Sequence, residues 1–380
     1  MKILHLISGG DQGGAKTHVI TLLRELSKNA DITLVCLLEQ DFAIEARDQG
    51  INVIVMQQNK RYKLDIVKSL ISMLEKDKYD ILHCHGARAN FIGMLIKKKY
   101  SIPTVSTIHS DYKFDFDNNL YKKLVYTTLN YFSLKHMDYF IAITNQFKQM
   151  LVGRGFKQDK IYVAYNGIKI TPRNYSMSRE EFLSRYNIKY SQDKIYVGIA
   201  TRLHPVKGIP VFLKAAEKVL KTNNNIQFLI AGNGDANYTN KYKEYVKTNK
   251  LEDNVVFLNF VKDIDNFYNA IDINVLTSHS ESFPYALLEG GLNKKATICS
   301  RVGGIPEMII NEQSGLLFED GNYDKLAEYV ERLAGDVELR LQYSNNLYNR
   351  IENNFSDKNM AKTHIEIYRS ILTGNIKRGR

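Results

Sequence analysis

Short apolar runs rich in β-branched residues alternate along this chain with longer segments in which apolar residues recur every three or four positions. The second pattern is typical of amphipathic helices, as in Val19, Leu22, Leu23 and Leu26. The first predicts strands at 3–7, 32–38, 53–56, 81–84, 103–108, 139–143 and 161–164, and then at 196–200, 226–231, 255–258, 273–276, 296–299 and 316–318. This alternation indicates βαβ units, so we expect α/β architecture with parallel sheets covered by helices.

A Pro-containing polar stretch interrupts the alternation at 171–176, just after Asn166-Gly167. At 380 residues the chain is also longer than a single core usually supports. We therefore expect two Rossmann-like domains, at 1–170 and 193–359, with a linker at 171–192. Such sheets bind ligands at the carboxyl ends of their strands, so we expect the two domains to face a central cleft.

The composition argues against a membrane-spanning or secreted protein. No apolar run reaches the ~20 residues needed to cross a bilayer, and the run at 3–7 is too short for a signal-peptide core. The three cysteines, Cys36, Cys84 and Cys299, each lie in an apolar run, where a free thiol behaves as a small hydrophobe. These features predict a cytoplasmic protein.

Positive charge is concentrated in the first half, where residues 1–170 hold 24 Lys and Arg against 16 Asp and Glu, a net +8 of the total +11. Such a field attracts phosphorylated substrates, anionic lipid or nucleic acid. Because no nucleic-acid-binding motif accompanies it, we expect no nucleic-acid partner. Segment 118–137 mixes aromatic and aliphatic residues with lysines, and predicts either a helix on an anionic membrane surface or a core helix.

Glycine-rich loops follow two of the predicted strands, at Gly9-Gly10-Asp11-Gln12-Gly13-Gly14 and at Gly232-Asn233-Gly234. Glycines there let backbone N–H groups approach an anion at a helix N-terminus, and a flexible connection is the plainer alternative. Neither loop fits the Gly-x-Gly-x-x-Gly dinucleotide pattern, since position 11 is Asp and the second loop lacks its third glycine. Both departures argue against a nicotinamide dehydrogenase.

Two cations and two carboxylates are the candidate site residues of the second half. Arg202 and Lys207, five residues apart after the strand at 196–200, are spaced to clamp a diphosphate or are ordinary solvated charges. We expect Pro284 in the first turn of an apolar helix, with Glu281 near its N-terminus and Glu289 about two turns along it. A buried carboxylate needs a partner, either ribose hydroxyls or a structural ion pair.

These motifs occur in order with Thr107-Ile108-His109 and Gly303-Gly304-Ile305-Pro306-Glu307. Together they resemble the family 4 retaining glycosyltransferases of GT-B fold over nearly the whole chain. The resemblance implies transfer of a hexose or N-acetylhexosamine from a nucleotide diphosphate sugar, with a UDP-sugar favoured, to a hydroxyl of a cell-surface glycan or lipid-linked acceptor. It also implies a location in the cytoplasm or on the inner face of the membrane.

The resemblance assigns a role to each candidate residue. Arg202 and Lys207 would hold the donor diphosphate, Glu289 the ribose, and Glu281 the donor sugar. His109 would lie against that sugar, and the implied catalytic set is Glu281, His109, Arg202 and Lys207. The implied donor-binding residues also include Gly13, Gly14, Gly232, Asn233, Phe283 and Pro284. A final helix near 360–375 would pack back onto the first domain.

The implied mechanism needs no metal or cofactor, because Arg202 and Lys207 would stabilise the charge that develops on the leaving diphosphate. We expect same-face attack with retention, and the resemblance implies that the donor phosphate helps to deprotonate the acceptor. His83 and His85 share a strand face, but two ligands do not make a closed zinc site. A glycan phosphorylase or sugar epimerase of the same architecture, or a non-catalytic partner subunit, stays open.

Overall fold

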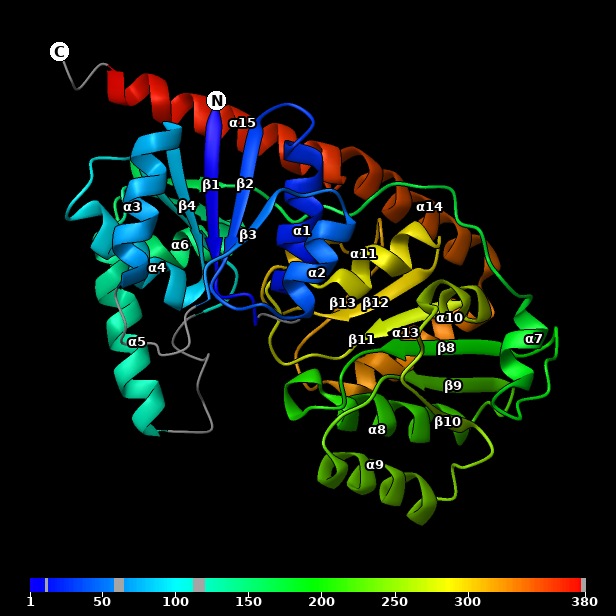
Figure 1. Ribbon diagram of the computed structural model, residues 1–380. Helices are drawn as coiled ribbons and strands as arrows, with labels where there is room; N and C mark the ends of the chain where they lie inside the picture. The colour runs from blue at the N-terminus through cyan, green and yellow to red at the C-terminus, as the bar shows by residue number, and fades with distance from the viewer. Residues whose placement is uncertain (11–12, 58–64, 112–119, 377–380) are drawn as a thin grey trace. The chain divides into compact units, whose positions relative to one another are not determined.

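A computed structural model describes residues 1–10, 13–57, 65–111 and 120–376 of this chain (Figure 1). The chain divides into two compact units, of which the N-terminal unit comprises residues 1–169 and 356–380 and the C-terminal unit residues 170–355. Each unit is an α/β domain built on one parallel sheet, as the alternating pattern predicts.

The N-terminal unit contains a seven-stranded sheet in its described residues, in the order β3-β2-β1-β4-β5-β6-β7. Every neighbouring pair is parallel. The strands are β1 (Lys2–Ile7), β2 (Asp31–Cys36), β3 (Val53–Val55), β4 (Ile81–His85), β5 (Thr104–Ile108), β6 (Tyr139–Ala142) and β7 (Ile161–Val163). The chain order reverses between β1 and β4, and this switch point is where doubly wound sheets bind ligands.

Helices cover this sheet because their apolar stripes need a surface on which to pack. In α1, Val19, Leu22, Leu23 and Leu26 are fully buried, as their spacing predicts. The helices are α1 (Gly14–Leu26), α2 (Asp41–Asp48), α3 (Asp65–Asp77), α4 (Gly86–Lys97), α5 (Leu120–Lys135), α6 (Asn145–Gly153) and α15 (Asp357–Ile376). The last of them, α15, returns to this unit and buries Tyr368 and Ile371 in the same core as Val19 and Leu23 (red in Figure 1).

The C-terminal unit repeats the arrangement with a six-stranded parallel sheet, in the order β10-β9-β8-β11-β12-β13. Its strands are β8 (Ile195–Ala200), β9 (Ile226–Ala231), β10 (Val255–Asn259), β11 (Ile273–Leu276), β12 (Ala296–Ser300) and β13 (Leu316–Phe318). Its helices are α7 (Arg179–Ser184), α8 (Ile209–Leu220), α9 (Ala236–Thr248), α10 (Ile264–Ala270), α11 (Tyr285–Leu292), α12 (Ile305–Met308), α13 (Tyr323–Gly335) and α14 (Val337–Asn354). The switch point of this sheet lies between β8 and β11.

The predicted strands all form, and their bounds agree with the predictions to within about two residues. The stretch 171–192, predicted to be a linker, belongs instead to the C-terminal unit. It contains α7, whose Phe182 and Leu183 are buried in a core with Phe267 and Ile271. The prediction misses this helix because α7 is only six residues long. Among the described residues no helix is long and apolar enough to span a bilayer.

Candidate functional site

Arg202 lies on the loop that follows β8. The loop leads into a 3-10 helix (Pro205–Lys207), which His204 caps by accepting the backbone N–H of Val206 at Nδ1, 3.3 Å away. Arg202 is exposed, and its guanidinium makes no hydrogen bond or ion pair with any residue that the structure describes. Its charge is therefore available to a ligand without the loss of an internal contact.

The loop that follows β9 packs directly on the Arg202 loop. Gly232 has φ +138°, and a Cβ there would lie 1.8 Å from the carbonyl oxygen of Thr201. The N–H of Leu203 donates to the carbonyl of Asn233 at 2.9 Å. Only glycine permits this approach, so Gly232 holds the two loops together and leaves Asn233 exposed beside them.

Lys207 and Glu281, predicted separately, form one ion pair. Lys207 Nζ lies 2.5 Å from Glu281 Oε1, and their side chains are only 17% and 11% exposed. Ser278 Oγ donates to the same carboxylate oxygen at 2.7 Å. The structure therefore joins a diphosphate candidate to a donor-sugar candidate at the switch point of the C-terminal sheet.

Backbone contacts fix both partners of this pair. A Cβ at Gly208, which has φ +63°, would lie 1.9 Å from the carbonyl oxygen of Thr277, and Thr277 Oγ1 donates to the carbonyl of Lys207 at 2.9 Å. A Cβ at Gly303 would lie 1.6 Å from the carbonyl oxygen of Glu281. Loops from β8, β11 and β12 thus meet around the ion pair.

The placement of Pro284 and Glu281 relative to α11 corrects the sequence prediction. Helix α11 begins at Tyr285, and Pro284 is its N-cap residue rather than part of the first turn, because its ψ of 125° is extended. Glu281 therefore precedes the helix, and only Glu289 lies within it. The ring of Phe283 packs against Phe355, 5.3 Å between centroids, so this side chain belongs to the core of the unit.

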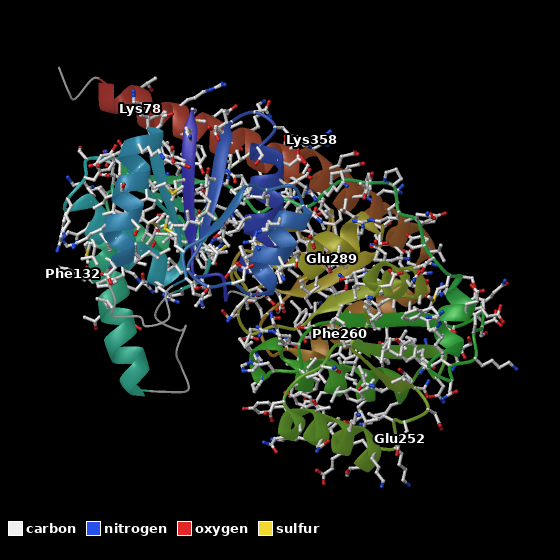
Figure 2. All side chains as sticks on the ribbon, in the orientation of Figure 1. Lys78, Phe132, Glu252, Phe260, Glu289 and Lys358 are labelled. Carbon is white, nitrogen blue, oxygen red and sulfur yellow. The ribbon has the colours of Figure 1, made fainter. Side chains whose placement is uncertain are left out.

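Glu289 is half-buried on α11 (labelled in Figure 2). Tyr268 donates its hydroxyl to Glu289 Oε2 at 3.3 Å. Burial raises the pKa of Glu289, while the Tyr268 hydrogen bond lowers it and the nearby Asp265 carboxylate raises it. The hydroxyl of Tyr285 is buried nearby with no hydrogen-bond partner among the described residues.

An ion pair between Arg173 and Asp265, close enough to Glu289 to affect its pKa, was not predicted from the sequence. Arg173 Nη1 lies 3.1 Å from both carboxylate oxygens of Asp265, and Asn293 Nδ2 donates to Asp265 Oδ1 at 3.0 Å. Arg173 lies in the stretch predicted to be a linker, 92 residues before its partner. No local pattern connects residues so far apart, and Tyr268 likewise has no motif that marks it.

Gly13 and Gly14, two predicted donor-binding residues, lie at the start of α1 in the N-terminal unit. Gly13 has φ +68° and caps α1, whose first residue is Gly14 and whose first turn holds no acidic side chain. Among the described residues of the first turn, no acidic side chain neutralises the positive end of the helix dipole. Asp11 and Gln12 of the same predicted loop lie outside the described residues.

His109 directly follows β5 and is half-buried. Its Nε2 lies 3.2 Å from His85 Nδ1, and its ring centroid lies 4.7 Å from that of His18. Burial lowers the pKa of His109 to about 4, and the imidazole of His364 lowers it too. His109 is therefore neutral at physiological pH.

The histidine pair predicted on β4 has a third member. His5 on β1 lies in register with His83, and the nitrogens of His5, His83 and His85 lie within 4.8 Å of one another. Such a trio could hold a metal ion. However, His83 bonds Tyr368 OH at 2.6 Å and Thr107 Oγ1 at 2.7 Å, and the His83 and His85 rings are stacked rather than convergent. The three histidines therefore fit a hydrogen-bonded network better than a metal site.

Two family models match the chain, one in each half. Residues 12–171 match Glycosyltransferase Family 4, and residues 182–350 match Glycosyl transferases group 1. The division between the two models falls close to the division between the two units.

Two curated relatives extend this likeness. An uncharacterized glycosyltransferase of Methanocaldococcus jannaschii, MJ1607, is 26% identical over 94% of each chain. The UDP-Gal:alpha-D-GlcNAc-diphosphoundecaprenol alpha-1,3-galactosyltransferase of Escherichia coli is 28% identical over 76% of each chain.

Among solved structures, Alr3699/HepE of Anabaena in complex with UDP superimposes with a TM-score of 0.84. It is 19% identical, over 97% of this chain and all of that one. The solved structure shares the GT-B fold with this chain.

Proposed function

Because this chain belongs to the glycosyltransferases, as a family 4 and group 1 enzyme of GT-B fold, we propose that it transfers a hexose or N-acetylhexosamine from a nucleotide diphosphate sugar, with UDP-sugar as the favoured donor. The acceptor is a hydroxyl of a cell-surface glycan or lipid-linked sugar. The observation that carries the proposal is the cation set after β8, in which exposed Arg202 and paired Lys207 flank one loop. The relative that carries UDP-Gal in its name, and the neighbour solved with UDP, support the choice of base.

Charge development explains why two cations belong there. As the bond between the anomeric carbon and the phosphate oxygen breaks, the nucleoside diphosphate gains a negative charge and the sugar ring becomes positive. Arg202 has no internal partner to lose, so it offers its full charge to the leaving group. Lys207 donates one hydrogen bond to Glu281, and the other N–H groups of its ammonium can donate to the diphosphate. Because the ion pair fixes both side chains, Lys207 binds the diphosphate and Glu281 binds the sugar beside it.

Glu289 serves the ribose in this proposal. Its carboxylate accepts the Tyr268 hydroxyl and has further lone pairs for the two ribose hydroxyls. The unpartnered hydroxyl of Tyr285 is a second polar group close to it. Such contacts are alike in the ground and transition states, so we expect them to set donor affinity more than turnover.

Retention rests on the resemblance to the retaining glycosyltransferases. Glu281 accepts hydrogen bonds from Lys207 and Ser278, and Glu289 accepts one from Tyr268, so we assign both carboxylates to binding rather than to nucleophilic attack. We therefore propose same-face attack, in which the departing phosphate takes the proton of the acceptor hydroxyl. The same cations make a divalent metal unnecessary for charge neutralisation.

A membrane-bound acceptor is favoured by the surface of α5. Leu129, Tyr131 and Phe132 are exposed, and Phe132 is 50% exposed (labelled in Figure 2). Lys98 Nζ lies 5.8 Å from the centre of the Phe132 ring, and Lys135 Nζ lies 5.3 Å from that of Tyr131. Aromatic side chains beside lysines suit the interface of an anionic bilayer.

Thermal unfolding of the full chain with a panel of UDP-, GDP- and ADP-sugars tests the proposal. A donor present at 100 times its Kd should stabilise the protein by about 2.7 kcal/mol. The stabilising donor is then incubated with candidate acceptors, with and without excess EDTA, and the anomeric configuration of the product is read by NMR. Absence of stabilisation by every sugar nucleotide contradicts donor binding, an inverted product contradicts retention, and reversible loss of turnover in EDTA contradicts metal independence.

A further inference from the structure

Six of the nine histidines of this chain gather in the N-terminal unit. They come from β1, β4, the end of β5, α1 and α15, and ring centroids are as close as 4.4 Å. All except His109 are at most 1% exposed. We call these residues the histidine cluster: His5, His18, His83, His85, His109 and His364.

The histidine cluster is uncharged at neutral pH. Burial lowers the pKa of His5 to about 3, and the pKa values of His109 and His364 to about 4. The imidazole of His364 lowers the pKa values of His5 and His109 further, whereas the hydrogen bond to the Met360 carbonyl raises the pKa of His364. Each ring therefore carries one N–H and one bare nitrogen, so every hydrogen bond constrains which nitrogen holds the proton.

Two members show which tautomer this environment selects. His364 Nδ1 lies 2.8 Å from the carbonyl oxygen of Met360, which can only accept, so His364 carries its proton on Nδ1. His18 Nδ1 faces the amide oxygen of Asn166 at 2.8 Å and is a donor for the same reason. Both rings leave a bare Nε2 buried without a partner among the described residues.

Three further imidazoles form a chain. His5 Nδ1 lies 3.0 Å from His85 Nε2, and His85 Nδ1 lies 3.2 Å from His109 Nε2. Each of these two hydrogen bonds, or bridges, contains one proton. Because neutral His85 has one N–H and one bare nitrogen, it donates in one bridge and accepts in the other, so both bridges run in the same direction. The inner end is His5 Nε2, which is buried and unpartnered among the described residues.

The unpartnered Nε2 of His5 decides in which direction the two hydrogen bonds run. If His109 donates to His85 and His85 to His5, then His5 Nε2 carries a buried N–H without an acceptor. If His5 donates to His85 and His85 to His109, then His5 Nε2 is a buried nitrogen without a proton. Orphan buried N–H groups are the rarer of the two, and His18 and His364 both leave a bare Nε2 in the same cluster. His5 then donates from Nδ1 to His85, and His85 donates from Nδ1 to His109.

We propose that His5 and His85 are positioning residues that fix His109 as its Nδ1–H tautomer, so that His109 presents a neutral N–H donor to an acceptor oxygen of the nucleotide sugar. The identity of that ligand rests on the proposed function. With Nε2 already accepting from His85 and Nδ1 already protonated, His109 has no free lone pair with which to act as a base. The proton of the acceptor hydroxyl must then leave to another group, such as a phosphate oxygen of the donor.

Long-range 1H–15N correlation NMR of the full chain with 15N-labelled histidine, recorded at pH 7.5 without ligand, tests the tautomer directly. The signals of His109 are identified by their loss in His109→Gln. We expect His109, His85 and His5 all to be protonated on Nδ1. A His109 protonated on Nε2 overturns the proposal, and this result needs no substitution at His5 or His85.

Substitution in the chain tests the positioning role. His85→Leu removes both bridges, so we expect the Nε2–H form of His109 to rise to a detectable fraction. His364→Leu is the matched control, because it removes an equally buried ring of the same cluster that makes neither of these two hydrogen bonds, and it should leave the tautomer of His109 unchanged at pH 7.5. An unaltered His109 in His85→Leu, or an equal change in both variants, contradicts the proposal. Binding of UDP by the same samples, followed by calorimetry, reports separately on the proposed function.

Discussion

The two sheets share one strand order around their switch points but carry opposite chemistry there. In the C-terminal unit the loops after β8 and β11 hold an exposed Arg202 and the Lys207–Glu281 ion pair. In the N-terminal unit the corresponding strands, β1 and β4, carry His5, His83 and His85, which are buried and neutral. The C-terminal unit therefore has a charged edge, formed by Arg202 and the Lys207–Glu281 pair, whereas strands β1 and β4 of the N-terminal unit carry neutral imidazoles.

This difference matches the demands of the proposed reaction. A leaving diphosphate gains negative charge and needs fixed cations, which the C-terminal unit supplies. A sugar that becomes positive during transfer is not helped by a second set of cations. The partly exposed imidazole of His109, whose protonation burial opposes, can donate a hydrogen bond without adding positive charge.

The largest expected effect is a loss of stability at acidic pH in the N-terminal unit, which the C-terminal unit should not share. Unfolded histidines bind protons below about pH 6.5, whereas the buried ones stay neutral to lower pH, so the free energy of unfolding falls as the pH falls. The lowered pKa values of His5, His109 and His364 together predict a loss of about 6 kcal/mol between pH 7 and pH 5. The pH window is the interval from about 6.5 down to about 4.

Hydrogen exchange of the full chain, corrected for the intrinsic effect of pH, measures this loss in each unit. Protection of β1, β4 and α15 should fall between pH 7 and pH 5, while protection of β8 and β11 should change little. The C-terminal unit is the internal control, since His204 and His279 are exposed. Parallel loss in both units would show that the buried histidines do not control acid stability.

The next effect concerns the charged edge. Arg202→Ala should lower kcat by roughly a hundredfold, about 3 kcal/mol, because the contact strengthens as the diphosphate leaves. Stability should not change, because Arg202 has no partner among the described residues. Steady-state kinetics with the donor selected by thermal unfolding provide the measurement. Lys189→Ala removes another exposed cation of the same unit and is the control; a normal kcat for Arg202→Ala rules out the proposed role.

A smaller effect is expected at Glu289. Glu289→Gln keeps the shape but replaces a carboxylate acceptor, so we expect about a tenfold increase in the Kd of UDP with little change in kcat. Calorimetry with UDP measures the affinity. Glu252→Gln, an exposed carboxylate of the same unit (labelled in Figure 2), should leave the Kd unchanged. A fall in kcat at constant Kd would move Glu289 from the ribose to the reacting sugar.

The smallest effect concerns the surface of α5. The chain should sediment with phosphatidylserine-containing vesicles a few-fold more than with phosphatidylcholine vesicles, and salt should weaken the difference. Phe132→Ser should reduce this binding, and Phe260→Ser, which changes an exposed aromatic residue of the C-terminal unit, should not. Equal binding of wild type to both vesicles would remove the membrane from the proposal.

The strands and the two-domain division are predictable from sequence because they depend on local periodicity. Each strand of the sheets is a short apolar run, and burial of such runs is what forms the two cores. Residues 171–192 are mistaken for a linker because α7 is short and its burial depends on α10, more than 80 residues later.

The site is less accessible to sequence reasoning. Ordered motifs single out Arg202, Lys207, Glu281 and Glu289 as candidates, but the ion pair between Lys207 and Glu281 joins residues 74 apart. The histidine cluster shows the same limit more strongly. His83 and His85 are visible as a strand pair. His5 approaches them only when β1 pairs with β4, and His18 and His364 only when α1 and α15 pack on the sheet.

Hydrogen-exchange footprinting of the full chain with UDP tests most directly whether the charged edge of the C-terminal unit binds the donor nucleotide. We predict that saturating UDP slows exchange at 201–208, 232–234 and 281–289 by at least tenfold. The protection should be lost at the same UDP concentration in Arg202→Ala and kept in Lys189→Ala. If UDP leaves these three loops unprotected, or protects them equally in both variants, then Arg202 and the Lys207–Glu281 pair do not form the donor site.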